Sequence, residues 1–370
     1  MRIQSIKTSD IGLEVFWDYK VKSCFSWFWL RDHSESSTDL HPHTLQRQID
    51  SFSKPLDNTV RKVWMDKSME YVHIKWCDDS SSLLSSSLLE SMSEPAIPQF
   101  NTLDSTELWD SEDEIALFPE MTYDQLMDDD NGINIWLEHI KRVGFVLVCN
   151  SPPTAVATKK LMQRISYLRN SIFGEFSVWD NKASNPNDTA YTSGAIELHT
   201  DATYAHDAPG LQTLHCIQKE SQGGENQLID GLAIAELMKI EFPDAFDVLC
   251  KIPVPGRYIS SDVHLETCRP VFRVNSDNKV FQVSFNNHDR SPFRLDNDEM
   301  EGFYEAYGVF HRLAHNIDRQ FEFMLEPGTI LTFDNWRLLH GRASLTGYRK
   351  LCGGYHNRED FESRIRLRLS

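Results

Sequence analysis

The sequence predicts an α+β fold that is mainly β: a double-stranded β-helix, or jelly-roll barrel, with flanking helices, preceded by a small β-rich domain. Beyond about residue 186, short apolar runs alternate with turn residues, as in Gln212–Ile217 and Val280–Phe285. Helical patterns interrupt these runs near Leu232–Glu241 and Asp298–Asn316. Many short strands with a few helices at one side are typical of a jelly roll whose helices cover the outer sheet.

The first part of the chain predicts a small β-rich domain. Its apolar runs are short and rich in β-branched and aromatic residues, which favours strands. These runs are Leu13–Trp17, Phe25–Trp29 and Tyr71–Trp76. Ser-rich and acidic stretches then change the composition between about residues 80 and 115. We therefore expect an N-terminal domain at residues 1–95, a linker at 96–120 and the barrel domain at 121–370.

A helix, a buried strand and a second helix are expected at the start of the barrel domain. Asn134–Arg142 has the spacing of an amphipathic helix, and Gly144–Cys149 is an apolar run of strand length. Pro152 and Pro153 separate this strand from Ala155–Asn170, where helical periodicity resumes.

The composition indicates a packed globular protein with an acidic surface. Of the 370 residues, 40% are hydrophobic and 11% aromatic, and 55 acidic against 37 basic residues give a net charge of −18. Nucleic acids and anionic membranes would repel such a surface. We therefore expect neither a nucleic-acid partner nor a membrane partner.

Cysteine usage and the first residues indicate an intracellular protein. The seven cysteines are dispersed and show no CxxC spacing, which is typical of reduced thiols rather than of a disulfide framework. The first ten residues have neither an apolar core nor an Arg-rich amphipathic pattern, and no run reaches the roughly 18 apolar residues of a membrane span. We expect a cytoplasmic protein, or a mitochondrial one if a cryptic targeting signal is present.

A candidate iron site is formed by His199, Asp201 and the distant His340. Two imidazoles and one carboxylate suit non-haem Fe(II) when three coordination positions stay open for cosubstrate and oxygen. Side chains two positions apart on a strand project from the same face, so His199 and Asp201 are expected to reach one ion. We expect another strand of the same barrel to supply His340.

Further motifs follow the His-x-Asp pair in a fixed order. They are Gly223-Gly224-Glu225-Asn226, Phe333-Asp334-Asn335-Trp336, His340 and Arg349. On these motifs the chain, from roughly Phe173 to Leu369, resembles the γ-butyrobetaine and trimethyllysine hydroxylases. These enzymes belong to the taurine-dioxygenase branch of the Fe(II)/2-oxoglutarate oxygenases. The resemblance implies Fe(II), the cosubstrate 2-oxoglutarate and O2, with succinate and CO2 as coproducts and a possible homodimer.

The resemblance also implies a site for 2-oxoglutarate. A planar guanidinium holds a carboxylate through two parallel charge-assisted hydrogen bonds, which a lysine does not reproduce. By resemblance, Arg349 has this role, and Asn226 stands where the family often has a Thr or Ser that assists. Arg342 and Arg337 are competing candidates at less favourable positions.

Substrate recognition in the resembled enzymes uses an aromatic cage that attracts a trimethylammonium group by cation–π interaction. Tyr191 matches one wall of this cage, and Phe173 stands where the family has a Tyr. The cage Trp position falls within Phe176–Val178, which leaves Trp179 out of register. Other positions that line the family's pocket, where an acid could meet an α-amino group, are Asp188, Tyr204, Asn286 and Asn287.

The N-terminal domain departs from the resembled enzymes at their zinc site. Those enzymes often carry zinc-binding cysteines just after a Trp-Leu-Arg-Asp motif, whereas His33–His43 contains none. Thiolates dominate structural zinc sites. We therefore expect no structural zinc and interpret His41 and His43 as surface histidines.

These features predict an Fe(II)/2-oxoglutarate oxygenase that hydroxylates, desaturates or cyclises a small amino acid or amino-acid-like substrate. A trimethyllysine dioxygenase of carnitine biosynthesis is an alternative, favoured by the His340–Arg349 segment and disfavoured by the altered cage. A protein side-chain hydroxylase or demethylase is another, because an acidic surface suits basic peptides. A catalytically inactive binding module is the third, and the intact triad and Arg349 argue against it.

Overall fold

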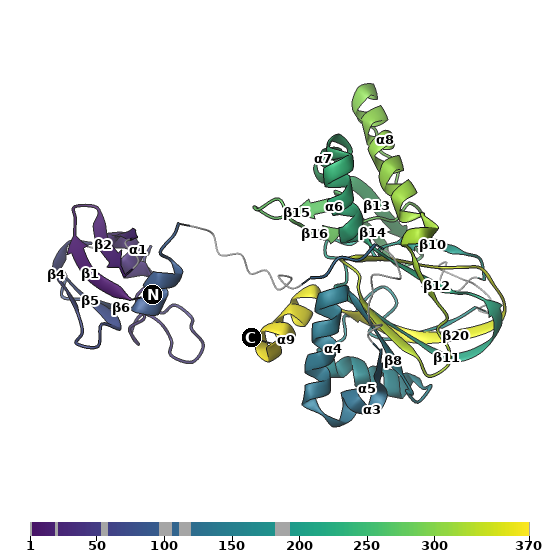
Figure 1. Cartoon of the computed structure of the whole chain (residues 1–370), viewed down its shortest axis with the longest axis horizontal. Coiled ribbons are helices and arrows are strands. Elements are labelled where there is room, and N and C mark those ends of the chain that lie inside the picture. The colour runs from purple at the N-terminus through teal and green to yellow at the C-terminus, as the bar shows by residue number, and fades with distance from the viewer. Residues whose placement is uncertain are drawn as a thin grey trace. The chain divides into compact units, whose positions relative to one another are not determined.

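The computed structural model describes residues 2–18, 21–52, 58–95, 106–110, 120–181 and 193–369. The chain divides into two compact units, Met1–Phe100 and Asn101–Ser370 (Figure 1). Helices and strands are both abundant, and the predicted α+β class is confirmed. In the described part of the chain, no helix is long and apolar enough to cross a bilayer.

The described residues of the N-terminal unit form two antiparallel sheets of three strands and two short helices. The first sheet contains β1 (Ile3–Thr8), β2 (Gly12–Trp17) and β3 (Lys22–Ser26). The second contains β4 (Val60–Met65), β5 (Tyr71–Trp76) and β6 (Ser81–Ser85). Alternate residues of these strands are buried in one apolar core. The helices are α1 (Trp27–Asp32) and α2 (Ser86–Ser91).

The predicted strand Phe25–Trp29 is wrong in this unit. Strand β3 ends at Ser26, and α1 begins at Trp27. The Ser26 side chain accepts a hydrogen bond from the backbone N–H of Trp29, which caps the helix. Ser26, although it lies inside an aromatic run, is thus the residue that caps the start of α1. His41 and His43 lie in a nearby surface turn, where His41 Nδ1 accepts the backbone N–H of His43.

Two sheets form the centre of the C-terminal unit. The larger has the order β7-β8-β18-β11-β20-β9, and the smaller has the order β10-β19-β12-β17. All pairs are antiparallel except the parallel pair β7–β8. The larger sheet comprises β7 (Glu120–Thr122), β8 (Phe145–Cys149), β18 (Ile330–Asp334), β11 (Leu211–Gly223), β20 (Leu345–His356) and β9 (Ser177–Asp180). The smaller comprises β10 (Ile196–His199), β19 (Leu338–Arg342), β12 (Asn226–Asp230) and β17 (Phe321–Phe323).

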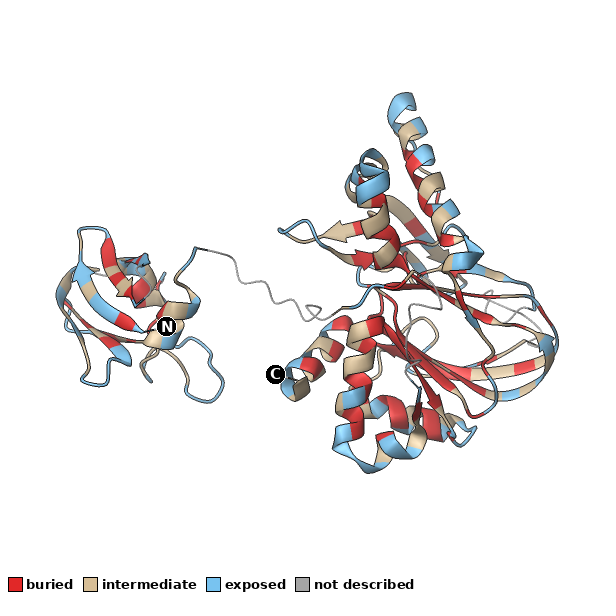
Figure 2. Cartoon of the chain, in the orientation of Figure 1, coloured by how far each residue is buried: buried red, intermediate tan, exposed pale blue. Residues whose placement is uncertain are grey.

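Helices cover the outer side of each sheet. The larger sheet packs against α3 (Tyr123–Asp128), α4 (Asp130–Val143), α5 (Ala155–Ile165) and α9 (Arg358–Leu369). The smaller sheet packs against α6 (Gly231–Glu241), α7 (Pro243–Lys251) and α8 (Asn297–Ala314). The unit also contains the hairpins β13–β14 (Val254–Ile259, His264–Arg269) and β15–β16 (Phe272–Val274, Val280–Val283) and the short helix η3 (Ile317–Arg319). Buried residues follow the sheets and the facing sides of the helices (Figure 2).

Strand alternation separates three apolar layers. On β8, Val146 and Val148 face the helices, whereas Phe145 and Leu147 pack in a core shared by both sheets. On β19, Leu338 belongs to this shared core. The alternation therefore determines which side chains enter the space between the sheets, where the pocket described below lies.

A buried ion pair joins several of these elements. Arg337 Nη2 lies 2.6 Å from Asp230 Oδ2, and both side chains are buried. Asp230 also accepts the backbone N–H groups of Leu232 and Ala233, which caps α6. Arg337 donates to the carbonyl of Arg142 at 2.9 Å. The pair therefore ties the turn between β18 and β19 to α6 and to the end of α4.

Replacing Asp230 should strongly destabilise the C-terminal unit. Asp230→Ala leaves a buried guanidinium without its partner, which costs about 3–5 kcal/mol. Asp247→Ala is the control, because its ion pair with Lys251 is exposed and is worth at most about 1 kcal/mol. Urea denaturation of both variants measures the free energy of unfolding. Equal losses would show that the buried pair does not stabilise the unit.

Candidate metal centre and pocket

His199 and His340 face each other across two neighbouring strands. In the register of β10 and β19 they are direct partners, and their ring centroids are 4.2 Å apart. Leu338 packs between the sheets, so His340, two positions along, points into the same space. Leu198 packs on the outer side of the small sheet, which directs His199 inward. The pairing of two strands thus brings both imidazoles together.

Asp201 joins them from a turn and not from the strand. The sequence predicted one strand for His199 and Asp201, but β10 ends at His199. Ala202 has a positive φ of 58°, and the Asn335 side chain accepts the Asp201 backbone N–H at 2.8 Å. Asn335 Nδ2 also donates to the Asp201 carbonyl at 3.3 Å. The turn is held by Asn335 and still carries the carboxylate to the imidazoles.

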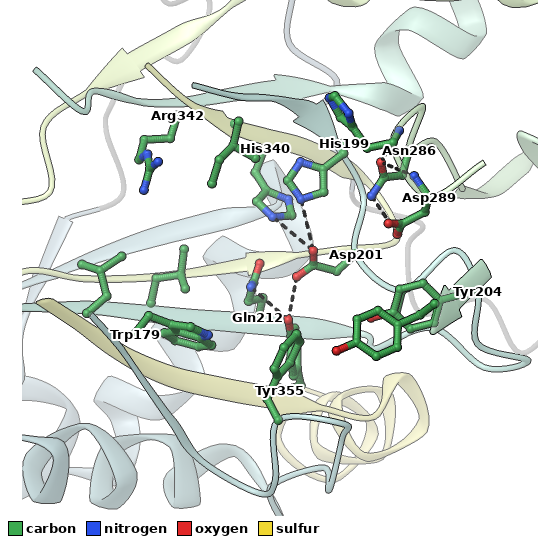
Figure 3. Close-up of a pocket in the computed structure, with 18 of the residues that line it drawn as sticks. Trp179, His199, Asp201, Tyr204, Gln212, Asn286, Asp289, His340, Arg342 and Tyr355 are labelled. Atoms are coloured by element: carbon green, nitrogen blue, oxygen red, sulfur yellow. Dashed lines mark hydrogen bonds and ion pairs between the residues drawn. The ribbon is translucent and has the colours of Figure 1, made fainter. Parts of the chain in front are cut away.

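The three side chains have the geometry of a metal centre. One ligand atom from each lies within 4.8 Å of the others. Asp201 Oδ1 is 3.2 Å from His199 Nε2 and 3.6 Å from His340 Nε2 (Figure 3). Donors bound at about 2.1 Å and at right angles to one ion are roughly 3 Å apart, so the set fits a single ion. His199 Nδ1 donates to the Glu197 carbonyl at 2.8 Å, which directs its Nε2 lone pair to the centre.

Burial and mutual charge set the protonation of these ligands. Burial lowers the pKa of His340 to about 3, and a nearby His199 adds to this effect. Burial opposes ionisation of Asp201, but His340 and His199 outweigh it and hold the carboxyl pKa below its ordinary value. Burial also disfavours charge on His199, yet the hydrogen bond to Asp201 raises its pKa. A neutral His340 and an ionised Asp201 are the forms that bind metals.

The centre lies in the wall of a pocket of about 390 Å³. A volume in this range is typical of sites for small molecules rather than for folded proteins. Arg349 and Asn226 form one part of the pocket lining, and aromatic and polar side chains form another.

Arg349 and Asn226 form a buried polar corner of the pocket. Arg349 Nη1 donates to the Gly224 carbonyl at 2.7 Å, and Nη2 donates to Asn226 Oδ1 at 3.1 Å. Among the described residues, Arg349 Nε and Asn226 Nδ2 are buried donors that lack a partner. Burial lowers the pKa of Arg349 from a very high ordinary value. Two unsatisfied donors beside a cationic group fit a carboxylate.

The competing arginines are placed differently. Arg337 is outside the pocket lining and is engaged by Asp230. Arg342 lines the pocket and donates to the Gly194 carbonyl at 2.5 Å. Burial and the charge of Arg349 lower the pKa of Arg342 to about 10. Of these two competing candidates, only Arg342 lines the pocket together with Arg349.

Most of the described residues expected to contact substrate line the pocket. Phe173, Tyr204 and Asn286 do so. Asn287 does not: it is exposed, and its Oδ1 accepts from Arg290 Nε at 3.4 Å. Asn286 and Asn287 are adjacent in one turn, and only the Asn286 side chain points into the pocket. Asp188 and Tyr191 lie outside the described residues.

Other pocket residues escaped the sequence interpretation. Trp179, which the resemblance left out of register, lines the pocket, whereas Val178 is exposed. Trp179 pairs with Leu351 across β9 and β20, and direct cross-strand partners share a face. The alternation of buried and exposed residues in Ser177–Asp180 could have indicated that Trp179 points inward. Tyr258 lies 5.2 Å from Tyr204, ring to ring, and had no sequence signal.

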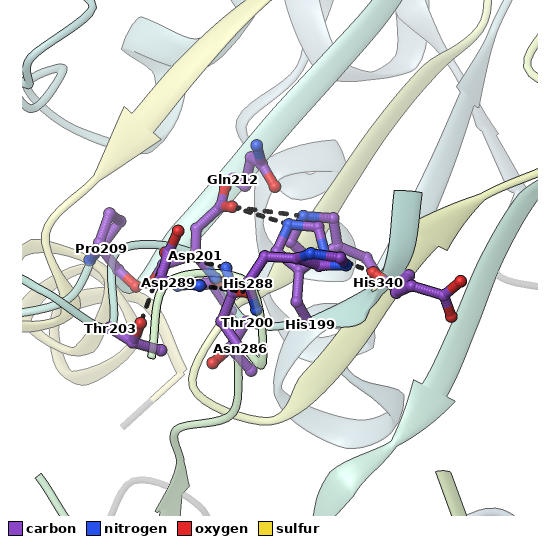
Figure 4. A network of polar contacts seen from close by, with 12 residues as sticks. His199, Thr200, Asp201, Thr203, Pro209, Gln212, Asn286, His288, Asp289 and His340 are labelled. Atoms are coloured by element: carbon purple, nitrogen blue, oxygen red, sulfur yellow. Dashed lines mark hydrogen bonds and ion pairs between the residues drawn. The ribbon is translucent and has the colours of Figure 1, made fainter. Parts of the chain in front are cut away.

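An acidic residue, Asp289, also lines the pocket. Its Oδ2 accepts from Asn286 Nδ2 at 2.9 Å and from Thr203 Oγ1 at 3.4 Å (Figure 4). These two donors hold the carboxylate beside the metal centre. The pocket therefore offers aromatic faces and a negative charge in one lining.

Comparison with known proteins decides the family. Residues 104–355 match the family model described as Taurine catabolism dioxygenase TauD, TfdA family. The chain belongs to this family. It is an Fe(II)/2-oxoglutarate-dependent dioxygenase, as the motifs predicted, and this cofactor and cosubstrate fit the donor sets at the centre and at Arg349. Its reaction is therefore an oxidation with 2-oxoglutarate and O2.

The enzyme is similar over nearly its whole length to curated relatives. Trimethyllysine dioxygenase of Meyerozyma guilliermondii is 31% identical, with 98% of this chain and 95% of the relative covered. The mitochondrial trimethyllysine dioxygenase of Bos taurus is 32% identical, with 93% and 82% covered. γ-Butyrobetaine dioxygenase of Pongo abelii is 26% identical, with 96% and 94% covered.

The fold is also similar to that of a solved structure. A taurine dioxygenase from Burkholderia xenovorans has a TM-score of 0.50 at 16% identity, with 68% of this chain and 91% of that chain covered. At this identity the likeness concerns the fold alone.

Removing one imidazole should abolish turnover. We expect His199→Ala to reduce 2-oxoglutarate-dependent succinate release below about 1% of wild type, because an imidazole of the centre is lost. His264→Ala is the control, since that histidine is exposed on β14. Iron content after anaerobic loading is measured in parallel. Full activity in His199→Ala would contradict the assignment of this centre.

Proposed function

We propose that the enzyme holds Fe(II) with His199, Asp201 and His340 and holds 2-oxoglutarate with Arg349 and Asn226. In this proposal it oxidises an unactivated C–H bond of a small amino acid that has a cationic side chain. The observation that carries the proposal is that the triad and the Arg349 corner line one pocket of about 390 Å³. Nε-Trimethyllysine is the first candidate substrate, because relatives that match nearly the whole chain carry that name.

We also propose that the two sheets form a double-stranded β-helix. Its support is the shared core: Phe145 and Phe333 of the larger sheet and Leu228 and Leu338 of the smaller one belong to a single apolar cluster. Antiparallel pairing within each sheet agrees with this architecture. The metal ligands would then project into the barrel interior.

The chain contributes binding and orientation to the chemistry. Bound Fe(II), with 2-oxoglutarate and O2, supplies an oxidant for C–H bonds and leaves succinate and CO2 as coproducts. The Glu197 carbonyl orients the His199 ring, and Asn335 orients the turn of Asp201. Arg349 anchors the distal carboxylate of the cosubstrate. The apolar walls then exclude water and hold the target carbon near the metal.

The pocket lining supports a cationic substrate. Phe173, Trp179, Tyr204 and Tyr258 provide aromatic faces that attract ammonium groups. Asp289 adds a carboxylate that can bind an ammonium by charge-assisted hydrogen bonding. Phe173 weakens the cage relative to a Tyr, so affinity for a quaternary group rests more on Trp179.

We propose three segments along the chain: the N-terminal domain at residues 1–95, the linker at 96–120 and the oxygenase domain at 121–370.

The cellular location and the assembly of the chain are also proposals. A cytoplasmic location is proposed, with mitochondria as the alternative because relatives such as that of Bos taurus are named mitochondrial. A homodimer is proposed as well, and light scattering of the full chain would test it.

Arg349→Lys should mainly weaken cosubstrate binding. Lysine keeps the charge but loses the two parallel hydrogen bonds, so we expect the apparent KM for 2-oxoglutarate to rise about 10- to 100-fold. The matched control is Arg342→Lys, a second buried pocket arginine. Steady-state succinate release gives both values. A rise in Arg342→Lys alone would move the carboxylate site to that residue.

Cationic amino acids should stimulate turnover most. We expect succinate release to be highest with Nε-trimethyllysine, lower with lysine and near background with neutral amino acids of similar length, because a neutral group gains no cation–π attraction. Stimulation by trimethyllysine alone would narrow the enzyme to a trimethyllysine dioxygenase. Greatest stimulation by a neutral amino acid or by a basic peptide would contradict the proposed substrate class.

A further inference from the structure

Tyr355 connects the metal centre to a buried glutamine. Its hydroxyl donates to Asp201 Oδ2 at 2.8 Å, and Gln212 Nε2 donates to the same hydroxyl at 3.3 Å (Figure 3). Tyr355 is 6% exposed and Gln212 is 5% exposed, and both line the pocket. The three side chains thus form a hydrogen-bond chain that ends on the carboxylate of the centre.

The backbone fixes the position of this chain. Gln212 and Tyr355 are direct partners in the antiparallel pairing of β11 and β20, so both side chains rise from the same face. On the other side of Tyr355, the backbone N–H of Arg169 donates to its carbonyl at 2.7 Å. The main chain of Tyr355 is thus held by neighbours on both sides, which fixes the point from which its side chain extends.

The direction of the chain follows from its chemistry. An ionised carboxylate only accepts hydrogen bonds, and a phenol has a single proton to donate. Tyr355 therefore gives its proton to Asp201 and receives a hydrogen bond from the amide N–H of Gln212. Each hydrogen bond in such a series strengthens the next by polarisation.

The two oxygens of Asp201 consequently have separate roles. Oδ1 is the atom nearest both imidazoles, whereas Oδ2 is occupied by Tyr355. A carboxylate that gave both oxygens to one ion would take up a coordination position that 2-oxoglutarate or O2 needs. The hydrogen bond from the Tyr355 hydroxyl to Oδ2 opposes that rotation.

We propose that Tyr355 is a positioning residue that keeps Asp201 bound to the metal through Oδ1 alone, and that Gln212 acts through Tyr355. This inference rests on the proposed role of Asp201 as a metal ligand. The outer partners of metal ligands commonly change metal affinity by about 10- to 100-fold when removed. Tyr355 is expected to belong to this class.

The test uses Co(II) as a probe with the metal-free full-length protein. Calorimetry gives the dissociation constant, and visible absorption reports the ligand arrangement. We expect Tyr355→Phe to weaken Co(II) binding about 10- to 100-fold and to change the absorption spectrum. Tyr348→Phe is the matched control: its hydroxyl, on the same strand, donates to Asp180 Oδ2 at 2.9 Å, away from the triad. Unchanged affinity and spectrum in Tyr355→Phe would overturn the proposal.

Two further variants separate the possible failures. Asp201→Ala should lose Co(II) binding; if it binds like wild type, the proposed metal centre itself is wrong. If Asp201→Ala loses binding but Tyr355→Phe does not, only the positioning role fails. Gln212→Leu should weaken binding about threefold, and adding it to Tyr355→Phe should cause no further loss. Additive losses would show that Gln212 does not act through Tyr355. Thermal unfolding of each metal-free variant identifies any loss that is merely structural.

Discussion

The antiparallel pairing of β10 with β19 is the constraint on which the site depends. It makes His199 and His340 direct partners, although they are far apart in the chain. Each strand has an outer residue, Leu198 or Leu339, in the core against α6–α8, and this burial fixes which face turns inward. A slip of one residue would send each imidazole to the opposite face. The same packing that stabilises the small sheet therefore brings the two imidazoles of the candidate metal centre together.

Polar contacts add what strand alternation cannot supply. Asp201 lies beyond its strand, so Asn335 holds its backbone and Tyr355 holds its second oxygen. Across the space between the sheets, β20 brings Arg349 and Tyr355 to one face because they are an even number of positions apart. The larger sheet thus supplies Arg349 and the hydrogen bond that supports the carboxylate, while the smaller sheet supplies the imidazoles.

The sequence indicates the candidate site residues more clearly than it indicates their geometry. His199, Asp201, His340 and Arg349 stand out because their residue types and their order match motifs of the resembled enzymes. The turn at Asp201 depends on a contact with Asn335, which lies far along the chain and leaves no local pattern. The same limit applies to the pocket. Trp179 enters it and Asn287 does not, because pairing partners and turn geometry decide their directions. Local pattern also missed α1, where a capping serine ends a strand-like run.

The position of the metal itself would test the proposed centre most directly. A crystal grown anaerobically with Fe(II) and 2-oxoglutarate would give an anomalous-scattering map at the iron absorption edge. We expect one peak about 2.1 Å from Nε2 of His199, Nε2 of His340 and Oδ1 of Asp201, with Oδ2 remote from the ion. An iron peak at any other residues, or none in a protein that turns over 2-oxoglutarate, would contradict it.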